Sequence, residues 1–321
     1  MKKRLRLPAG AVNLGGLALA WLAVFGYFSY YAPSFHTMDN LETLARQGTV
    51  VSMSALGMTY VIVSGGIDLS VGSIMAFVTV VVAWILQRNM GPVAALAAGV
   101  GAGAFCGLVN GFLITRLKVA PFIVTLGTYL IVRGAAKGMA HEQKIDAPIT
   151  WLNDLVARLG PDQRAMLFPA GVWLMLVLAV AVAWALRYTQ FGRHVVAVGS
   201  SEAAARLCGV PVERVKLLVY TMSGLFAGLG GLLLFSRLSV GDPTVAIGQE
   251  LDVIAAVVIG GASLSGGEGS VVGSLLGAFI MTTLRSGGSQ IGWENWRQEM
   301  ITGGIIIISV ALDRLRARRA V

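Results

Sequence analysis

The chain is a series of apolar segments separated by short polar ones. Most of the apolar segments are roughly 18 to 25 residues long, which is what an α-helix needs to cross a hydrocarbon core of ~30 Å. In that environment every backbone amide must be paired within the protein, so helices are the expected element. Ten candidate spans follow: 12–31, 48–64, 70–87, 92–115, 119–139, 168–187, 214–236, 250–264, 269–287 and 298–313. The pattern predicts an all-α integral membrane protein, a polytopic bundle of about ten helices in one domain (1–321).

Two of these spans, the second and the eighth, are short and end at a pair of glycines, so eight to eleven spans fit the pattern. Composition supports the membrane assignment. Of the 321 residues, 56% are hydrophobic and 13% are charged, against ~25% charged in soluble domains. The apolar stretch after Lys2 and Lys3 is long and aromatic, so we expect a retained first span rather than a cleaved signal peptide.

The net charge of +9 is distributed by side rather than gathered into a nucleic-acid surface. With a cytoplasmic N-terminus, ten spans place these basic residues inside: Arg116, Lys118, Arg187, Arg193, Arg206, Arg214, Lys216, Arg314, Arg316, Arg318 and Arg319. The other side receives acidic residues along with its bases: Asp39, Glu42, Glu142, Asp146, Asp154, Asp162, Asp242 and Glu294. The positive-inside rule therefore predicts cytoplasmic N- and C-termini, with the basic tail serving topology and lipid contact.

Neither cysteines nor histidines indicate a cofactor. Cys106 lies inside a span and Cys208 in a predicted cytoplasmic loop, so no structural disulfide is expected. The three histidines are far apart and show no metal-ligand spacing. Residues 264–268, Leu-Ser-Gly-Gly-Glu, look like the signature loop of ABC ATPases, but the chain lacks the glycine-rich phosphate loop with its lysine. The chain is therefore not itself an ATPase.

The segment around that loop is repeated. Residues 64–72 align with residues 259–267 at an offset of 195, matching Gly65 and Gly66 to Gly260 and Gly261. Both copies stand where one short apolar run ends and the next begins. Paired interruptions in two halves of a transporter point to its pathway, because irregular backbone at membrane depth must face protein or water. The alternative is a pair of well-capped cytoplasmic turns that only join spans.

Side chains after the glycines have a capping chemistry. Asp68, Ser70, Ser263 and Ser265 can accept hydrogen bonds from the free amides that open the next helix. Asp68 is also an ionisable group near membrane depth, which by default indicates function. The two roles are compatible. The predicted pathway residues are Gly65, Gly66, Asp68, Ser70, Asn110, Thr125, Gly260, Gly261, Ser263 and Ser265.

Glycines recur every four residues within three spans: Gly99, Gly103, Gly107 and Gly111; Gly269, Gly273 and Gly277; Gly224 and Gly228. Small residues at this period let helix backbones approach closely, so we expect them to pack helices rather than line a solute path. Polar residues in or near the spans are few: Thr59, Asn110, Thr115, Thr125, Thr128, Thr221, Ser223, Thr282 and Thr283. An unpaired Asn110 would be costly, so we expect it to bond a neighbouring helix or a hydroxylated solute.

The longest polar stretch on the predicted inner side is a loop at about 188–214. Its middle reads as a short helix, with Ser200 or Ser201 as N-cap, Glu202 at the positive end of the dipole and Gly209 as the stop. Pro211 can open the helix that follows. Ala204, Leu207 and Cys208 give the short helix a small apolar face that is suited to docking in another protein.

Taken together, residues 57–73, 110–113, 121–128, 199–210 and 251–267 resemble the permease subunits of bacterial ABC sugar importers, the ribose, xylose, arabinose and galactoside group. The resemblance covers about residues 40–310. It implies a pore-forming subunit of the inner membrane that imports a sugar. Its implied partners are cytoplasmic ATPase subunits that carry ATP and Mg²⁺, a second permease copy or paralogue, and a periplasmic sugar-binding protein. No cofactor is expected on this chain and no nucleic-acid partner.

The same resemblance implies a coupling helix that seats in the ATPase, formed by Ser201, Glu202, Ala203, Ala204, Ala205, Arg206, Leu207 and Gly209. One departure is the charged stretch predicted to be periplasmic, at about 140–167. Three alternatives remain at this stage. They are a branched-chain amino acid permease of related layout, an ion-coupled secondary transporter with Asp68 as its ion site, and a membrane scaffold that transports nothing.

Overall fold

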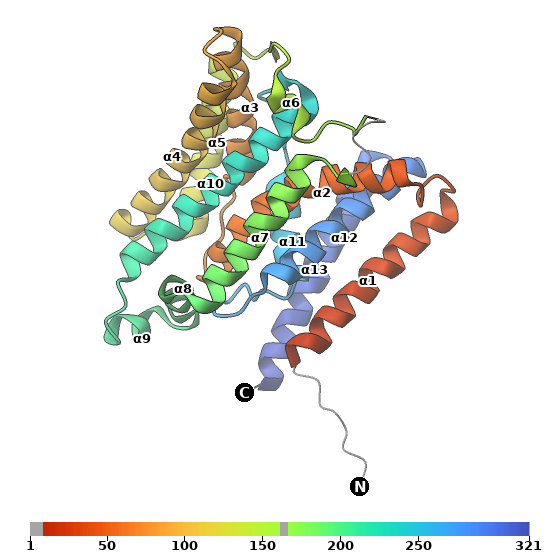
Figure 1. Ribbon diagram of the computed structural model, residues 1–321. Coiled ribbons are helices and arrows are strands. Elements are labelled where there is room, and N and C mark those ends of the chain that lie inside the picture. The colour runs from red at the N-terminus through yellow and green to blue at the C-terminus, as the bar shows by residue number, and fades with distance from the viewer. Residues whose placement is uncertain (1–8, 161–165, 321) are drawn as a thin grey trace.

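The computed structural model describes residues 9–160 and 166–320, and these residues are almost entirely helical (Figure 1). The helices are α1 (Ala9–Tyr31), α2 (Met38–Val63), α3 (Val71–Gln87), α4 (Pro92–Leu117), α5 (Pro121–Met139), α6 (Trp151–Asp154), α7 (Ala170–Tyr188), α8 (Gln190–Ser200), α9 (Glu202–Leu207), α10 (Val212–Leu238), α11 (Gln249–Ile259), α12 (Val271–Gln290) and α13 (Asn295–Ala320). Two short strands, β1 (Ile145–Asp146) and β2 (Val240–Gly241), complete the elements.

Each of the ten predicted spans coincides with one helix, and α6, α8 and α9 lie in the connections between them. Within the described residues, five helices are long and apolar enough to cross a membrane, namely α1, α4, α7, α10 and α12. The chain is thus a polytopic helical bundle. α11 has 11 residues and is about 16 Å long, which is too short to cross a core of ~30 Å by itself.

Three boundaries differ from the prediction by five residues or more, and one of them is the end of α13, at Ala320 rather than at residue 313. α2 begins at Met38, ten residues before the predicted start. The apolar pattern did not reveal its first turns because they carry the charged residues Asp39, Glu42 and Arg46. α11 ends at Ile259 rather than at residue 264, because Gly261 takes φ +91° and closes the helix. In α2 and α11 the position of the helix end therefore depends on backbone geometry and tertiary packing rather than on the length of the apolar run.

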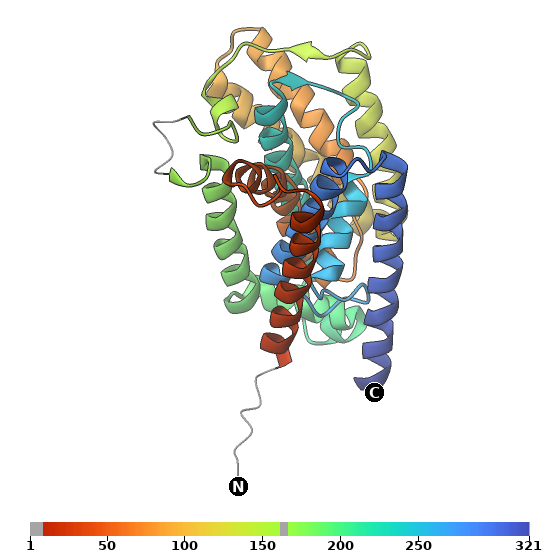
Figure 2. The ribbon, with the colours of Figure 1, turned by 90° about the vertical axis from the view of Figure 1, so that its right-hand side faces the viewer.

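The bundle has two distinct ends. α8 and α9 lie at one end, together with the start of α1 and the end of α13 (Figures 1 and 2). We call this the α9 end. The strands and α6 lie at the opposite end, which we call the strand end (Figure 1). The two described ends of the chain are therefore on the same side of the bundle.

The core is built around α10, which packs against α4, α2 and α3. At the α4–α10 crossing, Gly103 and Gly107 face Gly224 and Gly228 so closely that a Cβ on Gly103 would lie 2.6 Å from Gly224 O. The prediction that the glycines pack helices is confirmed here. Gly273 and Gly277 of α12 face the backbone of α11 in the same manner.

The predicted periplasmic stretch, 140–167, packs against the central helices through its described residues. β1 pairs antiparallel with β2, and the Lys144 Nζ lies 3.2 Å from Asp242 Oδ2. At α6, the Ser236 Oγ on α10 donates to Asn153 O at 2.9 Å and accepts from Val156 N at 3.1 Å. This segment therefore covers the strand end of the central helices; Asp162, which was expected on this side, lies outside the described residues.

Candidate functional site

The two glycine-rich repeats form helix ends of the same type. In each, the amide of a glycine and that of the next residue donate to carbonyls in the last helical turn, at 2.9 to 3.2 Å. The glycine with positive φ is Gly65 (+80°) after α2 and Gly261 (+91°) after α11. The structural equivalence therefore pairs Gly65 with Gly261, one residue away from the sequence alignment, which paired it with Gly260. We call residues 64–70 the first junction and residues 260–270 the second junction.

The first junction is held by a network around Asp68. Its Oδ1 accepts from Ser70 N at 2.9 Å and from Ser70 Oγ at 2.6 Å, and its Oδ2 accepts from Ser223 Oγ of α10 at 2.8 Å. Asn110 of α4 donates from Nδ2 to Ser70 Oγ at 2.8 Å, and Thr125 of α5 donates to Ile67 O at 3.3 Å. The structure thus brings together four of the predicted residues, Asp68, Ser70, Asn110 and Thr125, with Asp68 fully buried.

Asn110 bonds a neighbouring segment through its Nδ2, which is one of the two roles expected for it. Its Oδ1 is buried and has no hydrogen-bond partner among the described residues. The buried Tyr220 hydroxyl of α10 packs so closely on the first junction that a Cβ on Gly66 would overlap it. The first junction therefore combines close packing with a buried polar atom, Asn110 Oδ1, that has no hydrogen-bond partner among the described residues.

The second junction has a different capping residue from those predicted. Ser265 N donates to Ser263 Oγ at 3.3 Å, but α12 is capped by Ser270, whose Oγ accepts from Gly273 N at 3.2 Å. Gly266 and Gly267 both have positive φ. The second junction is four residues longer than the first, 260–270 against 64–70. The sequence repeat therefore matches the ends of α2 and α11 but not the starts of α3 and α12.

Both junctions meet the end of α8 at a single point. Gly267 N donates to Val63 O at 2.8 Å, so the second junction is bonded to the last residue of α2, just before the first junction. A Cβ on Gly266 would lie 2.6 Å from Gly199 O and 2.9 Å from Gly65 Cα, and a Cβ on Gly199 would overlap Val63 O. Sequence reasoning missed Gly199, because a lone glycine carries no signal for a tertiary contact. Because Gly199 contacts Gly65 and Gly266, a displacement of α8 would also displace both junctions.

α9 follows directly after this contact and projects from the bundle. Ser201 Oγ accepts from Ala204 N at 3.3 Å and Gly209 has φ +78°, so the predicted N-cap and stop are confirmed. Within the helix only Ala205 is buried, whereas Leu207 is 90% exposed. The structure therefore leaves an apolar side chain in solvent on a well-capped helix.

Ion pairs hold α9 against the start of α10. Glu202 accepts from Arg206 Nη2 at 2.9 Å and from Lys216 Nζ, and Arg206 also pairs with Glu213. These hydrogen bonds, first that of Lys216 and then that of Arg206, lower the pKa of the Glu202 carboxyl. Exposed pairs contribute only ~0.2–1 kcal/mol each, so their effect is to fix the direction in which α9 points.

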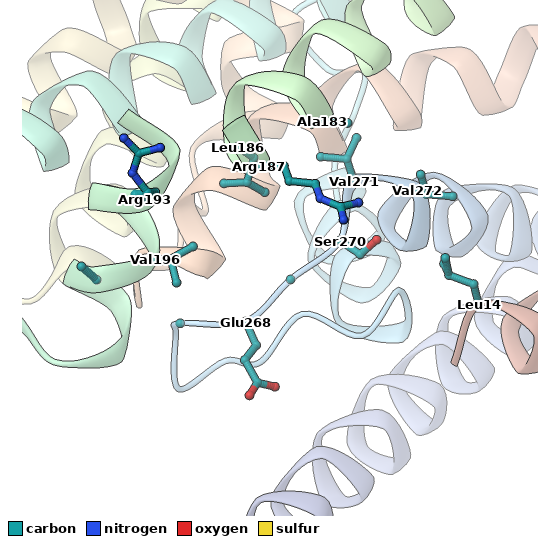
Figure 3. A pocket seen from close by; sticks show the side chains of 13 residues that line it. Leu14, Ala183, Leu186, Arg187, Arg193, Val196, Glu268, Ser270, Val271 and Val272 are labelled. Carbon is teal, nitrogen blue, oxygen red and sulfur yellow. The ribbon is translucent and has the colours of Figure 1, made fainter. Parts of the chain in front are cut away.

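A cavity of about 820 Å³ adjoins the second junction. It is bounded by α1, α7, α8 and residues 267–272 (Figure 3). Figure 3 shows Arg187 directed toward the segment that carries Ser270. The second junction is therefore packed against Gly199 at Gly266 and borders a cavity along residues 267–270.

No metal centre is found among residues 9–160 and 166–320, where no three His, Cys, Asp or Glu side chains gather. Cys106 and Cys208 are free thiols. The site is consequently built from backbone, hydroxyl and amide groups and one buried carboxylate.

Comparison with known proteins gives the context of this arrangement. The family model described as "Branched-chain amino acid transport system / permease component" matches residues 40–310. No solved structure matches the chain. The ribose import permease protein RbsC of Bacillus subtilis (strain 168) is 40% identical over 324 residues, 98% of this chain and 97% of the relative.

Two further relatives agree. The ribose import permease protein RbsC of Escherichia coli (strain K12) is 37% identical over 92% of both chains. The L-arabinose ABC transporter permease protein AraH of Azospirillum brasilense is 36% identical over 95% of this chain and 88% of the relative. This chain belongs to the family of membrane permease subunits of bacterial ABC sugar importers that includes the ribose and arabinose permeases.

Proposed function

We propose that this subunit carries a monosaccharide, in the first instance a pentose such as D-ribose or L-arabinose, from a periplasmic binding protein into the cytoplasm. The observation that carries the proposal is the nearly full-length similarity to permeases named for these two sugars. The family model is named for branched-chain amino acids, so leucine is the second candidate solute.

Identification of the binding protein tests the solute directly. The assembled importer is purified through a tag on this chain, and the co-purified binding protein is titrated with D-ribose, L-arabinose and L-leucine. Micromolar binding of a pentose is expected. Binding of leucine alone would assign the transporter to amino acids instead.

In the proposed topology ten helices cross the membrane, with the α9 end and both termini in the cytoplasm. Basic side chains near the α9 end support this orientation, among them Arg193, Arg206 and Lys216. A second permease, either a copy or a paralogue, would complete the pore. α3 and α11 would cross within the packed interior of the bundle. There the polar backbone groups at their ends can bond to neighbouring helices instead of facing lipid.

Cysteine labelling tests this orientation. Cys208 is exposed beside α9, so a membrane-impermeant maleimide is expected to label it in inside-out vesicles and not in intact spheroplasts. Gln143→Cys in a Cys208→Ser chain, at an exposed site of the strand end, is the matched control and should show the reverse. Labelling of Cys208 in spheroplasts would invert the topology.

We further propose that α9 docks in a groove of the ATPase, through Ser201 to Leu207 and Gly209. When ATP closes the motor, α9 and α8 would move together, and the Gly199 contact would pass the displacement to both junctions. The ten pathway residues predicted from sequence then act by allowing the junctions to rearrange. A neutral sugar fits this mechanism because it needs no buried counter-charge.

Substitution at the α9 tip is expected to uncouple transport. Leu207→Asp or Ala204→Trp should leave membrane insertion and melting temperature unchanged, since both side chains face solvent, but reduce ATP-dependent sugar uptake at least tenfold. The apolar replacement Leu207→Met is the control and should retain uptake. Normal transport by the aspartate and tryptophan variants would refute the docking role.

Substitutions of Asp68 separate charge from capping. Asp68→Asn keeps a carbonyl that can accept from Ser70 and is expected to fold with transport reduced only a few-fold. Asp68→Ala leaves three buried donors unpaired, at ~1–3 kcal/mol for each unsatisfied group, and should melt at a clearly lower temperature in detergent. Complete loss of transport in a well-folded Asn variant would instead indicate that the charge itself is used.

A further inference from the structure

A second, smaller cavity lies between α2, α10, α11 and α12, toward the strand end. Its volume is about 210 Å³, several times the ~30 Å³ that one water molecule takes in the liquid. Its polar lining consists of Gln47, Arg237, Gln249, Asp252, Thr282 and Arg285. None of these residues belongs to the junctions or to α9, so the cavity is a separate feature of the fold.

The charges around this cavity are only partly matched. Arg285 Nη2 donates to Asp252 Oδ1 at 2.8 Å, and the Asp252 side chain is 3% exposed. Arg237 makes no ion pair within the described part of the chain. Ionisable groups inside a membrane bundle face a partner or a water-filled cavity and mark solute paths. The position of these three groups thus indicates a polar route rather than a sealed core.

Two polar atoms of the residues that line the cavity lack a hydrogen-bond partner among the described residues. They are Gln249 Oε1, which is an acceptor, and Arg285 Nε, which is a donor. A hydroxyl group both donates and accepts, so a polyol can satisfy both kinds of atom. Val50, Val51 and Met281 supply an apolar wall, which suits the C–H face of a sugar ring.

We propose that this cavity binds sugar hydroxyl groups during passage through the permease, with Gln47, Gln249 and the Asp252–Arg285 pair as contacts. The proposal rests on the proposed function and adds a binding site to it. α11 links the two features, because Gln249 and Asp252 lie in its first turn and the second junction follows its last residue. Rearrangement of the junction would therefore reshape the cavity.

The first test measures transport against ATP consumption. The importer is reconstituted in proteoliposomes with its ATPase and binding protein, and uptake of radiolabelled D-ribose is divided by ATP hydrolysed. Gln47→Leu and Gln249→Leu are expected to lower this ratio at least fivefold while the loaded binding protein still stimulates hydrolysis. Gln143→Leu, the same change at an exposed site of the strand end, should stay within twofold of wild type.

Equal ratios in the two cavity variants and the control would overturn the binding site while leaving the proposed function intact. Failure of the wild-type complex to take up any pentose would instead contradict the proposed function. The two failures are therefore distinguishable.

The second test does not depend on flux. Val51→Cys is introduced into a chain with Cys106→Ser and Cys208→Ser, and its reaction with a water-soluble thiol reagent is followed in the complex. D-ribose with its binding protein is expected to slow the reaction at least threefold. Absence of protection, or protection by leucine and not by ribose, would overturn the sugar site.

Discussion

Replacing Gly107 of α4 with valine is expected to destabilise the whole bundle. A Cβ at this position would overlap Tyr220 O and lie 2.9 Å from Gly224 Cα, so the added atoms meet backbone that cannot rotate away. α4 and α10 must then move apart along the most extensive helix contact in the molecule. Overpacking costs ~1–3 kcal/mol where side chains can adjust, and we expect at least that here.

The matched control is Gly101→Val on the same helix. Nothing lies within 4 Å of a Cβ at Gly101. In detergent, the melting temperature of Gly107→Val should fall by ~2–4 °C per kcal/mol lost, together with its yield in the membrane, whereas that of Gly101→Val should not change. Equal melting temperatures for the two variants would contradict the close crossing of α4 and α10.

Replacing Gly199 with alanine is expected to abolish coupled transport. Alanine favours a helix over glycine by ~1 kcal/mol, so by propensity alone the change should be beneficial in α8. Its Cβ, however, would overlap Val63 O and lie 2.6 Å from Gly267 N, the two atoms that bond the end of α2 to the second junction. Either α8 or a junction must shift, and the contact that links them is lost.

The readout is ATP-dependent uptake in the reconstituted complex, with a decrease of at least tenfold expected for Gly199→Ala. Gly101→Ala is the control for the same chemical change at an open site. Preserved assembly with the ATPase, shown by co-purification, would place the defect in transmission rather than in docking. Full transport by Gly199→Ala would show that the contact of Gly199 with the junctions does not transmit motion from α8.

The sequence predicted the elements well where one local signal determines them. The ten apolar runs coincide with ten helices because burial in lipid requires long helical segments. The glycine ladder of α4 was recognised because a four-residue period places all members on one helix face. Ser201 and Gly209 were recognised because capping is a local interaction of a side chain with the nearest backbone.

Features that depend on the tertiary structure were not predictable in this way. In the repeat, either glycine of each pair can adopt positive φ, so the alignment could not show that Gly65 corresponds to Gly261. The contact of Gly199 with both junctions joins segments that are more than sixty residues apart in the chain. The polar cavity draws residues from four helices, and none of them forms a motif with its sequence neighbours.

Asp68 illustrates the limit most clearly. Sequence indicated a cap or a functional charge, and the structure places the carboxylate in a three-bond network that includes Ser223, 155 residues away. The bonds to Ser70 were foreseeable from spacing, since an Asp two residues before an amide can accept from it. The bond to Ser223 required knowledge of how α10 crosses the junction.

The central claim is that this chain is a conduit driven by a separate ATPase through α9. The most direct measurement is D-ribose uptake by proteoliposomes that contain this permease with or without its ATPase and binding protein, in the presence of ionophores that collapse proton and sodium gradients. The account predicts uptake that requires ATP and both partners and is unaffected by the ionophores. Uptake by the permease alone that follows an ion gradient and needs no ATP would contradict it.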